Sequence, residues 1–133
     1  MDCPACGGET LLVSALDLGG DLPGEPETLA VCRTCVTVSP GESETSTTDD
    51  PTAVAHLSTG LPDDPETALA MALLVTLCES LALNRREIEE LVSRIERAGT
   101  DPLSTLDYLA NDPDLDLVLD VERRRPQLVQ LLQ

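Results

Sequence analysis

The chain has 133 residues, of which 41% are hydrophobic, but Tyr108 is its only Phe, Tyr or Trp residue. This length suits one compact unit, or a small module joined to a slightly larger one, with a core of aliphatic side chains that each bury less area than an aromatic ring. Acidic residues number 25 and basic residues 8, all of them Arg, so the formal net charge is −17. The absence of Lys excludes Lys-dependent chemistry and the phosphate-binding P-loop.

The acidic residues are interleaved with apolar residues along most of the chain, which is not the pattern of a disordered acidic tail. Repulsion at this net charge would oppose a compact state in dilute buffer. At about 1 M salt the Debye length falls to roughly 3 Å, and most of that repulsion is screened. We therefore interpret the composition as that of a folded, halophilic protein. A solvated acidic surface in an ordinary cytosol is the alternative.

Residues 1–38 contain four of the five cysteines and three short β-prone runs. Strands are predicted at residues 11–13 and 28–31, and residues 36–38 lead out of the second cysteine pair. Three Gly and two Pro within residues 17–27 indicate a loop between the strands. The segment is predicted to form a β-hairpin module.

Residues 39–62 are predicted to be an acidic linker. Its first part, residues 40–52, consists mostly of Ser, Thr, Glu and Asp with almost nothing to bury, so we expect it to be mobile. Residues 53–61 are mildly apolar and could pack against either neighbouring module.

Residues 63–133 are predicted to form a helical domain. Its first helix begins at Asp64, a capping residue that precedes Pro65 in the first turn. The stretch that follows, residues 65–83, is apolar nearly all round, which is typical of a central buried helix.

A second helix is predicted to start after Asn84, with Glu87 as the capping-box partner of that residue. Gly99 is predicted to end this helix. The apolar side chains recur at the spacing of one helical face. They are Ile88, Leu91, Val92 and Ile95.

Two further helical segments complete the domain. A third helix is predicted to begin near Asp101, to use Leu103, Leu106 and Leu109, and to end before Pro113. Residues 115–132 have a helical pattern, but they contain Pro126, where we expect a kink or break because Pro removes a backbone hydrogen bond.

The predicted fold class is small α+β. It combines an N-terminal zinc ribbon, a β-hairpin with two cysteine knuckles, with a C-terminal bundle of three to four α-helices. The predicted domains are residues 1–38 for the ribbon, 39–62 for the mobile acidic linker and 63–133 for the helices.

The metal prediction rests on two C-x-x-C pairs separated by 25 residues, Cys3, Cys6, Cys32 and Cys35. Two intervening residues let both thiolates of a pair approach one ion from a tight turn. Gly7 permits the left-handed backbone that such a knuckle needs. Four thiolates from two knuckles form the closed tetrahedral shell of structural zinc, so we predict one structural Zn²⁺ at these cysteines.

Two disulfides, a redox dithiol and an iron site are the alternatives for the four cysteines. Disulfides are disfavoured inside cells, although some archaeal proteins contain them. A thioredoxin-like dithiol needs one C-x-x-C beside a βαβ pattern, which this sequence lacks. Iron accepts the same four thiolates, so the ligands alone do not distinguish iron from zinc.

Three consequences of a four-thiolate site are expected. The ribbon alone is too small to fold without help, so metal binding and folding should be coupled. The site adds about −2 to the local charge, with only Arg33 nearby to offset it. A closed shell leaves no position for water, so metal-assisted hydrolysis is not expected.

The remaining reactive side chains have simpler interpretations. Cys78 lies in the apolar helix and is interpreted as a small buried hydrophobe. His56, the only His, is interpreted as a linker or surface residue. With one His and no Lys, the chain has few residues that could form a catalytic pair of nucleophile and base.

Two charged clusters also have structural interpretations. Asp112, Asp114 and Asp116 alternate as in a calcium loop, but Leu117 occupies the position of the required Gly, so a helix-start acid cluster is favoured. The basic run at residues 123–125, with Arg85 and Arg86, could form a small patch. Pairing with surface carboxylates is the favoured interpretation.

The C-P-x-C-G sequence at Cys3 resembles the knuckle of the rubredoxin-like zinc-ribbon class. Rubredoxins proper shield their iron with aromatic side chains, which this ribbon lacks, so electron transfer is not expected. The class usually has Gly after the second knuckle as well, where this chain has Val36.

The whole chain also resembles a family of small haloarchaeal zinc-ribbon proteins of unknown function. The resemblance is carried by CPACGG, the acidic linker, ALAMALLVTLCESLALNRREIE, ERAGTDPLSTLDYLANDPDLD and ERRRPQL. The resemblance implies a zinc-binding protein of a halophilic archaeon. It implies no particular activity and no catalytic residue, because the function of the family is unknown.

The function predicted from these observations is a non-enzymatic interaction or regulatory module, with a protein partner or homodimer contact through the helical domain. A nucleic-acid-associated ribbon in transcription or translation is the alternative, although phosphate contact needs basic residues. A redox or metal-handling protein is a third option, and an enzyme is least favoured.

The location is predicted to be cytoplasmic, without membrane contact. No basic start followed by an apolar stretch marks a signal peptide. The most apolar run, residues 68–83, is short for a membrane span of about 20 residues.

Overall fold

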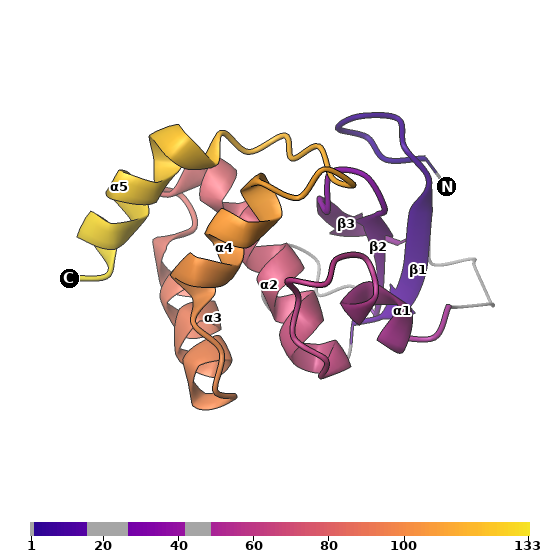
Figure 1. The fold of residues 1–133 in the computed structure, drawn as a ribbon, viewed down its shortest axis with the longest axis horizontal. Helices are drawn as coiled ribbons and strands as arrows, with labels where there is room; N and C mark the ends of the chain where they lie inside the picture. Colours follow the sequence, from indigo (N-terminus) through magenta and orange to yellow (C-terminus); the bar gives the residue numbers. More distant parts are fainter. Residues whose placement is uncertain (1, 16–26, 42–48) are drawn as a thin grey trace.

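The computed structural model describes residues 2–15, 27–41 and 49–133. It has the predicted small α+β class, with an antiparallel three-stranded sheet next to a group of helices (Figure 1). The strands are β1 (Thr10–Ser14), β2 (Thr28–Cys32) and β3 (Val38–Pro40), in the order β1-β2-β3. The helices are α1 (Thr52–Ala55), α2 (Pro65–Leu77) with the 3₁₀ turn η2 (Cys78–Ser80), α3 (Arg85–Arg97), α4 (Pro102–Ala110) and α5 (Val121–Leu131).

The sheet follows the predicted strands with one correction. Strands β1 and β2 coincide with the two β-prone runs, and Val31 pairs with Leu11 on one side and Val38 on the other. The third strand begins at residue 38 rather than 36, because the backbone between β2 and β3 is used for the second cysteine turn.

Both edges of the sheet are bonded to other parts of the chain. Beside β1, the Asp49 carboxylate accepts from the Leu12 N–H at 2.9 Å, and the Asp49 N–H donates to the Leu12 carbonyl. Beside β3, the Val38 N–H donates to Thr76 Oγ1 of α2 at 2.8 Å. The Thr76 hydroxyl donates in turn to the Ala72 carbonyl at 3.0 Å, so it links the sheet to the helix.

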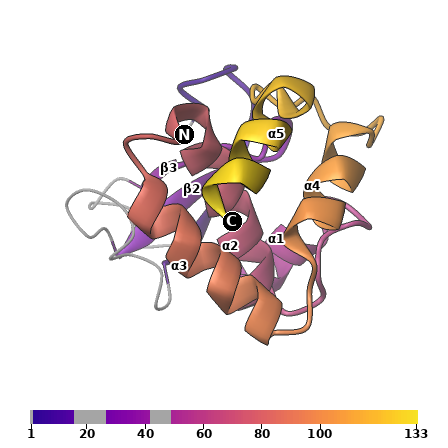
Figure 2. The same ribbon diagram turned by 90° about the vertical axis from the view of Figure 1, so that its left-hand side faces the viewer.

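Helix α2 is the centre of the molecule, as its apolar sequence predicts. It lies between the sheet and helices α3, α4 and α5 (Figures 1 and 2). The Asp64 carboxylate caps its first turn, accepting from the Thr67 N–H at 3.1 Å and the Thr67 hydroxyl at 2.6 Å. No helix in the described ranges is both long and apolar enough to cross a membrane.

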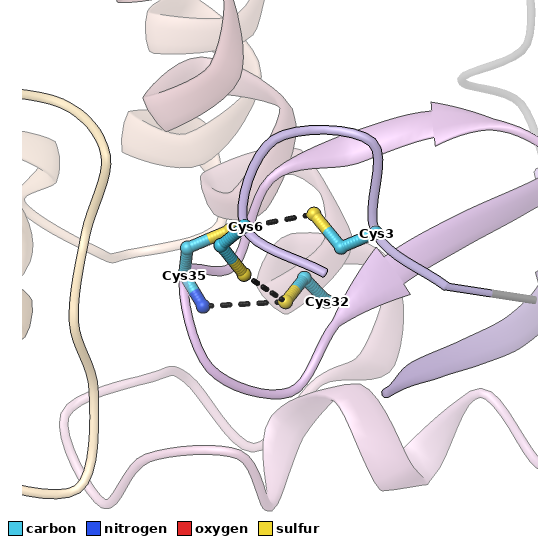
Figure 3. A group of neighbouring side chains, drawn as sticks. All are labelled: Cys3, Cys6, Cys32 and Cys35. Carbon is cyan, nitrogen blue, oxygen red and sulfur yellow. Dashed lines mark hydrogen bonds between the residues drawn. The ribbon is translucent and has the colours of Figure 1, made fainter. Parts of the chain in front are cut away.

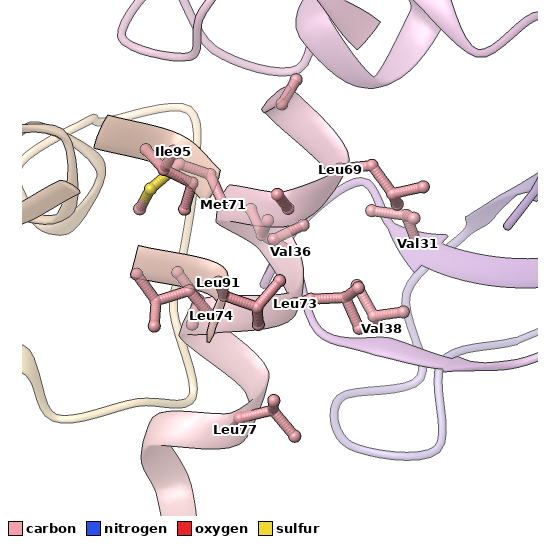
Figure 4. Packing of buried hydrophobic residues seen from close by; sticks show 14 of the residues in the cluster. Val31, Val36, Val38, Leu69, Met71, Leu73, Leu74, Leu77, Leu91 and Ile95 are labelled. Carbon is pink, nitrogen blue, oxygen red and sulfur yellow. The ribbon is translucent and has the colours of Figure 1, made fainter. Parts of the chain in front are cut away.

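One hydrophobic cluster contains residues of the strands and of the helices. From the sheet side it includes Leu11, Leu29, Val31 and Val38, and from α2 it includes Leu69, Leu73 and Leu74. Figure 4 shows Val31 next to Leu69 and Val38 next to Leu73. The described part of the predicted linker also contributes, through Val54 of α1 and Leu61. The division into three domains stays a prediction, but these parts share one buried core.

Helix α3 confirms its predicted apolar face and end but not its predicted cap. Its four predicted apolar side chains are all buried. Asn84 precedes the helix, but its amide donates to the Leu77 carbonyl of α2 at 3.0 Å and makes no capping bond. Gly99 has φ +91°, and bonds from Gly99 N to Glu96 O and Thr100 N to Ile95 O form a Schellman end.

The C-terminal region departs most from prediction. Helix α4 begins at the predicted Asp101 cap, but α5 begins after Asp120 rather than near residue 115. Residues 112–120 connect them as a non-helical segment. Helix α5 continues through Pro126 without a break. Pro126 has no N–H to donate to the carbonyl of Glu122, four residues earlier. Both residues are exposed, so water can bond that carbonyl instead.

The segment after α1 is tied to α4. Ser58 Oγ donates to the Asp112 carboxylate at 2.5 Å, and Thr59 Oγ1 lies 2.6 Å from the Tyr108 hydroxyl. A Cβ on Gly60 would lie 2.0 Å from the Tyr108 ring, so only Gly fits there. The predicted loop at residues 17–27 and the predicted mobile stretch fall largely on residues 16–26 and 42–48, outside the described residues.

Candidate metal centre

The four cysteines of the two C-x-x-C pairs lie in one cluster. Figure 3 shows two loops facing each other across the sulfur atoms of Cys3, Cys6, Cys32 and Cys35. All four Sγ atoms lie within 4.8 Å of one another. The sequence prediction that these residues share a site therefore agrees with their positions in the fold.

The two loops have the same hydrogen-bond pattern. In the first knuckle (residues 3–8), Gly7 N donates to Cys3 O at 2.8 Å and Cys3 N donates to Gly8 O at 2.8 Å. In the second knuckle (residues 32–37), Val36 N donates to Cys32 O at 3.1 Å, and Cys32 N donates to the Thr37 carbonyl at 3.0 Å. Gly7 and Val36 thus have the same role in the two knuckles, and so do Gly8 and Thr37.

The distances between sulfurs fit a shared ion and not a disulfide. Cys3 Sγ lies 3.6 Å from Cys35 Sγ, and Cys6 Sγ lies 3.4 Å from Cys32 Sγ. A disulfide requires about 2.05 Å, and all four thiols are free. With Zn–S bonds of about 2.3 Å, the edges of a tetrahedron of sulfurs are roughly 3.8 Å long, close to the observed spacing.

Backbone N–H groups donate to the sulfur atoms of the leading cysteines. Ala5 N donates to Cys3 Sγ at 3.4 Å, and Thr34 N donates to Cys32 Sγ at 3.3 Å. Cys35 N also points at Cys32 Sγ, at 3.4 Å. Such N–H groups stabilise thiolate charge, which matters here because the guanidinium of Arg33, the residue next to Cys32, is exposed and lies 4.0 Å from Glu9.

The thiols differ in their electrostatic environment. Burial raises the pKa of Cys32, but the N–H groups of Cys35 and Thr34 outweigh burial and hold its pKa at about 7. Burial raises the pKa of Cys35 to about 12, despite its bond to Thr37 Oγ1 at 3.0 Å. A dication between the sulfurs would favour the thiolate at both positions, and that is the chemistry of a four-thiolate site.

Gly8 lies in close contact with the cluster. A Cβ at this position would lie 3.1 Å from Thr34 Oγ1 and 3.2 Å from Cys32 Sγ. Gly8 and its counterpart Thr37 were not among the residues predicted from the sequence. The signal was available, because each follows the second Cys of its pair by two residues and closes the knuckle with its carbonyl.

The second knuckle reaches the geometry of the first without the usual Gly. Val36 has φ +64° and Gly7 has φ +77°, so both knuckles turn through the left-handed region. This region is unfavourable for a β-branched residue. The side chain of Val36 is fully buried in the hydrophobic cluster that contains the α2 residues (Figure 4), and this packing opposes the strain.

The other sequence candidates lie away from the cluster. Cys78 is buried in η2, and burial raises its pKa to about 12, although the charge of Arg124 acts the other way. This agrees with its interpretation as a small hydrophobe. His56 is exposed at the end of α1, as expected for a linker or surface residue.

The charged clusters are partly reassigned. Asp112, Asp114 and Asp116 do not start a helix, because the helix that follows is capped by Asp120. Instead, Asp112 accepts from Ser58 and from Asp114 N, and these bonds lower its pKa. Pairing of the basic residues with carboxylates is seen at Arg85–Glu89, Arg86–Glu90 and Arg125–Asp107.

Substitution of Val36 tests the balance between backbone strain and packing. We expect Val36→Gly to be more stable than Val36→Ala by about 1 kcal/mol, because Ala keeps the strained φ and Gly relieves it. The measurement is the free energy of unfolding in urea, with metal and salt held constant. Val31, buried in β2, is the matched control.

At Val31 the order should reverse, with the Gly variant less stable than the Ala variant, since a strand position gains nothing from glycine. The same order at both positions would contradict the strained geometry at Val36.

Comparison with known proteins gives a family and no characterised relative. A family model described as "Family of unknown function (DUF6276)" matches residues 2–132. No curated protein and no solved structure matches the chain. The match covers both knuckles and all the described helices. The chain therefore belongs to this family of unknown function, DUF6276.

Proposed function

We propose that the protein is a non-enzymatic interaction or regulatory module whose N-terminal ribbon is held by one structural Zn²⁺. The observation that carries the metal assignment is the convergence of four thiols from two equivalent knuckles. Four Cys ligands fill the shell of a structural zinc site and leave no position for a substrate or water. Zinc in this site would stabilise a rigid surface and would not itself act on a substrate.

Zinc is favoured over iron on the surroundings of the cluster. Iron–sulfur proteins for electron transfer tune the site through shielding and hydrogen bonding. Tyr108 is the only Phe, Tyr or Trp residue of the chain, and its hydroxyl lies 2.6 Å from Thr59 Oγ1. The five free thiols fit a reducing compartment, which supports a cytoplasmic location.

The partner surface is proposed to lie outside α2. An apolar helix offers an interface only if its neighbours leave part of it uncovered, and ten of the 13 residues of α2 are buried within the chain. The large apolar side chains that the described residues do expose are Leu83, Tyr108 and Val118. They lie on the α2–α3 connection, on α4 and on the segment before α5.

The nucleic-acid alternative has little support in the charge of the ribbon. Arg33 is its one basic residue, and it lies near Glu9. Phosphate contacts require several Lys or Arg side chains on one face. We therefore keep this alternative as an outcome of the binding experiment and not as the first proposal.

Adaptation to molar salt, and with it an origin in a halophilic archaeon, is part of the proposal. The net charge of −17 supports it. The ion pairs of the described residues involve exposed or half-exposed side chains, which contribute little individually and cannot offset such an excess.

Metal content tests the site directly. Purified protein should carry one equivalent of zinc per chain. Substitution of Cys3, Cys6, Cys32 or Cys35 by Ser should weaken metal binding about 100-fold or more, since each removes one of the four thiolates that would bind the ion. Elemental analysis and competition with a chromogenic chelator provide the measurements. Cys78→Ala is the matched control and should retain the metal. Loss of metal from this control, or iron in place of zinc, would count against the proposal.

Thermal unfolding in KCl tests the salt adaptation. Between 0.1 and 3 M KCl the melting temperature should rise by at least about 10 °C, because screening removes repulsion among the carboxylates. Sucrose at matched osmolality is the control for general solute exclusion and should have the smaller effect. A melting temperature that does not change with KCl would refute the halophilic interpretation.

An affinity pull-down from a high-salt lysate tests the interaction role. Wild type, Cys3→Ser/Cys35→Ser and Cys78→Ala would be compared, and bound protein and nucleic acid both identified. We expect one protein partner to be enriched by wild type and by Cys78→Ala, and lost with the double variant. Enrichment of nuclease-sensitive RNA or DNA instead would replace this proposal with the nucleic-acid alternative.

A further inference from the structure

We propose that the metal site is half-built before metal arrives. The second knuckle is held in place by the protein core, whereas the first knuckle is a clasp that metal closes. Loss of metal would then open residues 3–8 and leave the sheet and helices folded. This inference rests on the proposed metal site. Metal binding and folding were expected to be coupled throughout the small ribbon, and the inference confines that coupling to one loop.

The second knuckle is continuous with the sheet on both sides. Strand β2 runs into it at Cys32, and β3 begins directly after it at Val38. These two strands pair with each other, which fixes both ends of the turn. The Val38 N–H is bonded to Thr76 of α2, so the exit from the knuckle is also attached to the central helix.

The second knuckle is also packed into the core and bonded to a distant segment. Cys32, Cys35 and Val36 are fully buried, and Val36 is part of the main hydrophobic cluster. The Thr34 carbonyl accepts from the Asp116 N–H at 2.8 Å, which ties the tip of the knuckle to the segment before α5. None of these contacts involves a metal.

The first knuckle has fewer attachments, because only one strand, β1, adjoins it, and the bridge across its ends joins Asp2 to Glu9 outside the three named strands. Residues 4–7 are exposed, including the ligand Cys6. In the described parts of the chain, the hydrogen bonds of residues 3–8 either stay within this knuckle or join its sulfurs to those of Cys32 and Cys35. The nearest backbone anchor lies just beyond it, where Arg33 N donates to Glu9 O at 2.9 Å.

The metal is therefore the main link between the first knuckle and the rest of the molecule. Two bonds through Cys3 and Cys6 would hold this loop against a surface that already presents Cys32 and Cys35. Local opening of a weakly attached segment costs much less free energy than global unfolding. The exposed Cys6 side is then the route by which metal enters and leaves.

Hydrogen exchange followed by mass spectrometry tests this on the full chain. Zinc-loaded protein would be compared with protein stripped by a chelator under reducing conditions, both in molar KCl. Amide exchange in peptides covering residues 2–8 should accelerate by about 100-fold or more on stripping, while α2, α3 and β2 keep their protection. Exchange throughout α2 and β2 after stripping would overturn the proposal.

A pair of ligand variants gives a second measurement in the absence of metal. Cys6→Ala changes an exposed residue of the clasp and should leave the urea midpoint of the stripped protein unchanged. Cys32→Ala removes a buried side chain that accepts two N–H groups and should lower that midpoint. Equal effects of the two variants would contradict a preformed second knuckle.

The outcomes separate the two proposals. If wild-type protein binds no zinc, the proposed function fails and this inference with it. If zinc binds with one equivalent but stripping exposes the whole chain, the metal assignment holds and only the half-built site is wrong.

Discussion

A helix that is apolar on every side is stable in water only if every side is covered, and α2 imposes this requirement on the whole molecule. The sheet covers one side and helices α3 and α4 cover others, with α1 alongside. Because no Phe or Trp is available, this coverage depends on many small aliphatic contacts rather than on a few large rings. The helices therefore depend on the sheet for burial as much as the sheet depends on the helices.

This shared core explains why the second knuckle accepts an unfavourable residue. A glycine at position 36 would suit the backbone, but it would leave a gap among the buried aliphatic side chains. Val36 satisfies the packing requirement at the expense of backbone strain, typically of the order of 1–3 kcal/mol. Cavity costs for a lost buried side chain are of similar or larger size, so packing decides the residue.

Several features could be predicted because their signals are local. The cysteine spacing indicated the cluster, and Asp64, Asp101 and Gly99 marked helix ends through bonds to their own neighbours in sequence. The start of α5 could not be predicted in this way. Four Asp residues between positions 112 and 120 were all plausible caps, and distant partners decided between them. Ser58 engages Asp112, and the Thr34 carbonyl takes the Asp116 N–H, which leaves Asp120 to cap the helix.

The same limit applies to Asn84 and to the second knuckle. The sequence offers Asn84 both a capping bond and a bond to the end of α2, and only the packing of α2 against α3 selects the second. Likewise, no local pattern shows that the two knuckles differ in their attachment to the core. That difference arises from Thr76 and Asp116, which are 38 and 82 positions away from the backbone groups that they bond.

The bonded edges of the sheet restrict how this protein can meet another chain. Next to β1, Asp49 occupies the Leu12 donor and acceptor as a neighbouring strand would. Next to β3, Thr76 occupies the Val38 donor, and Pro40 has no N–H to offer. At these positions a partner has no free ladder to extend, so strand addition and edge-to-edge aggregation are both disfavoured. At these edge positions the proposed recognition of a partner would depend on side chains and not on backbone pairing.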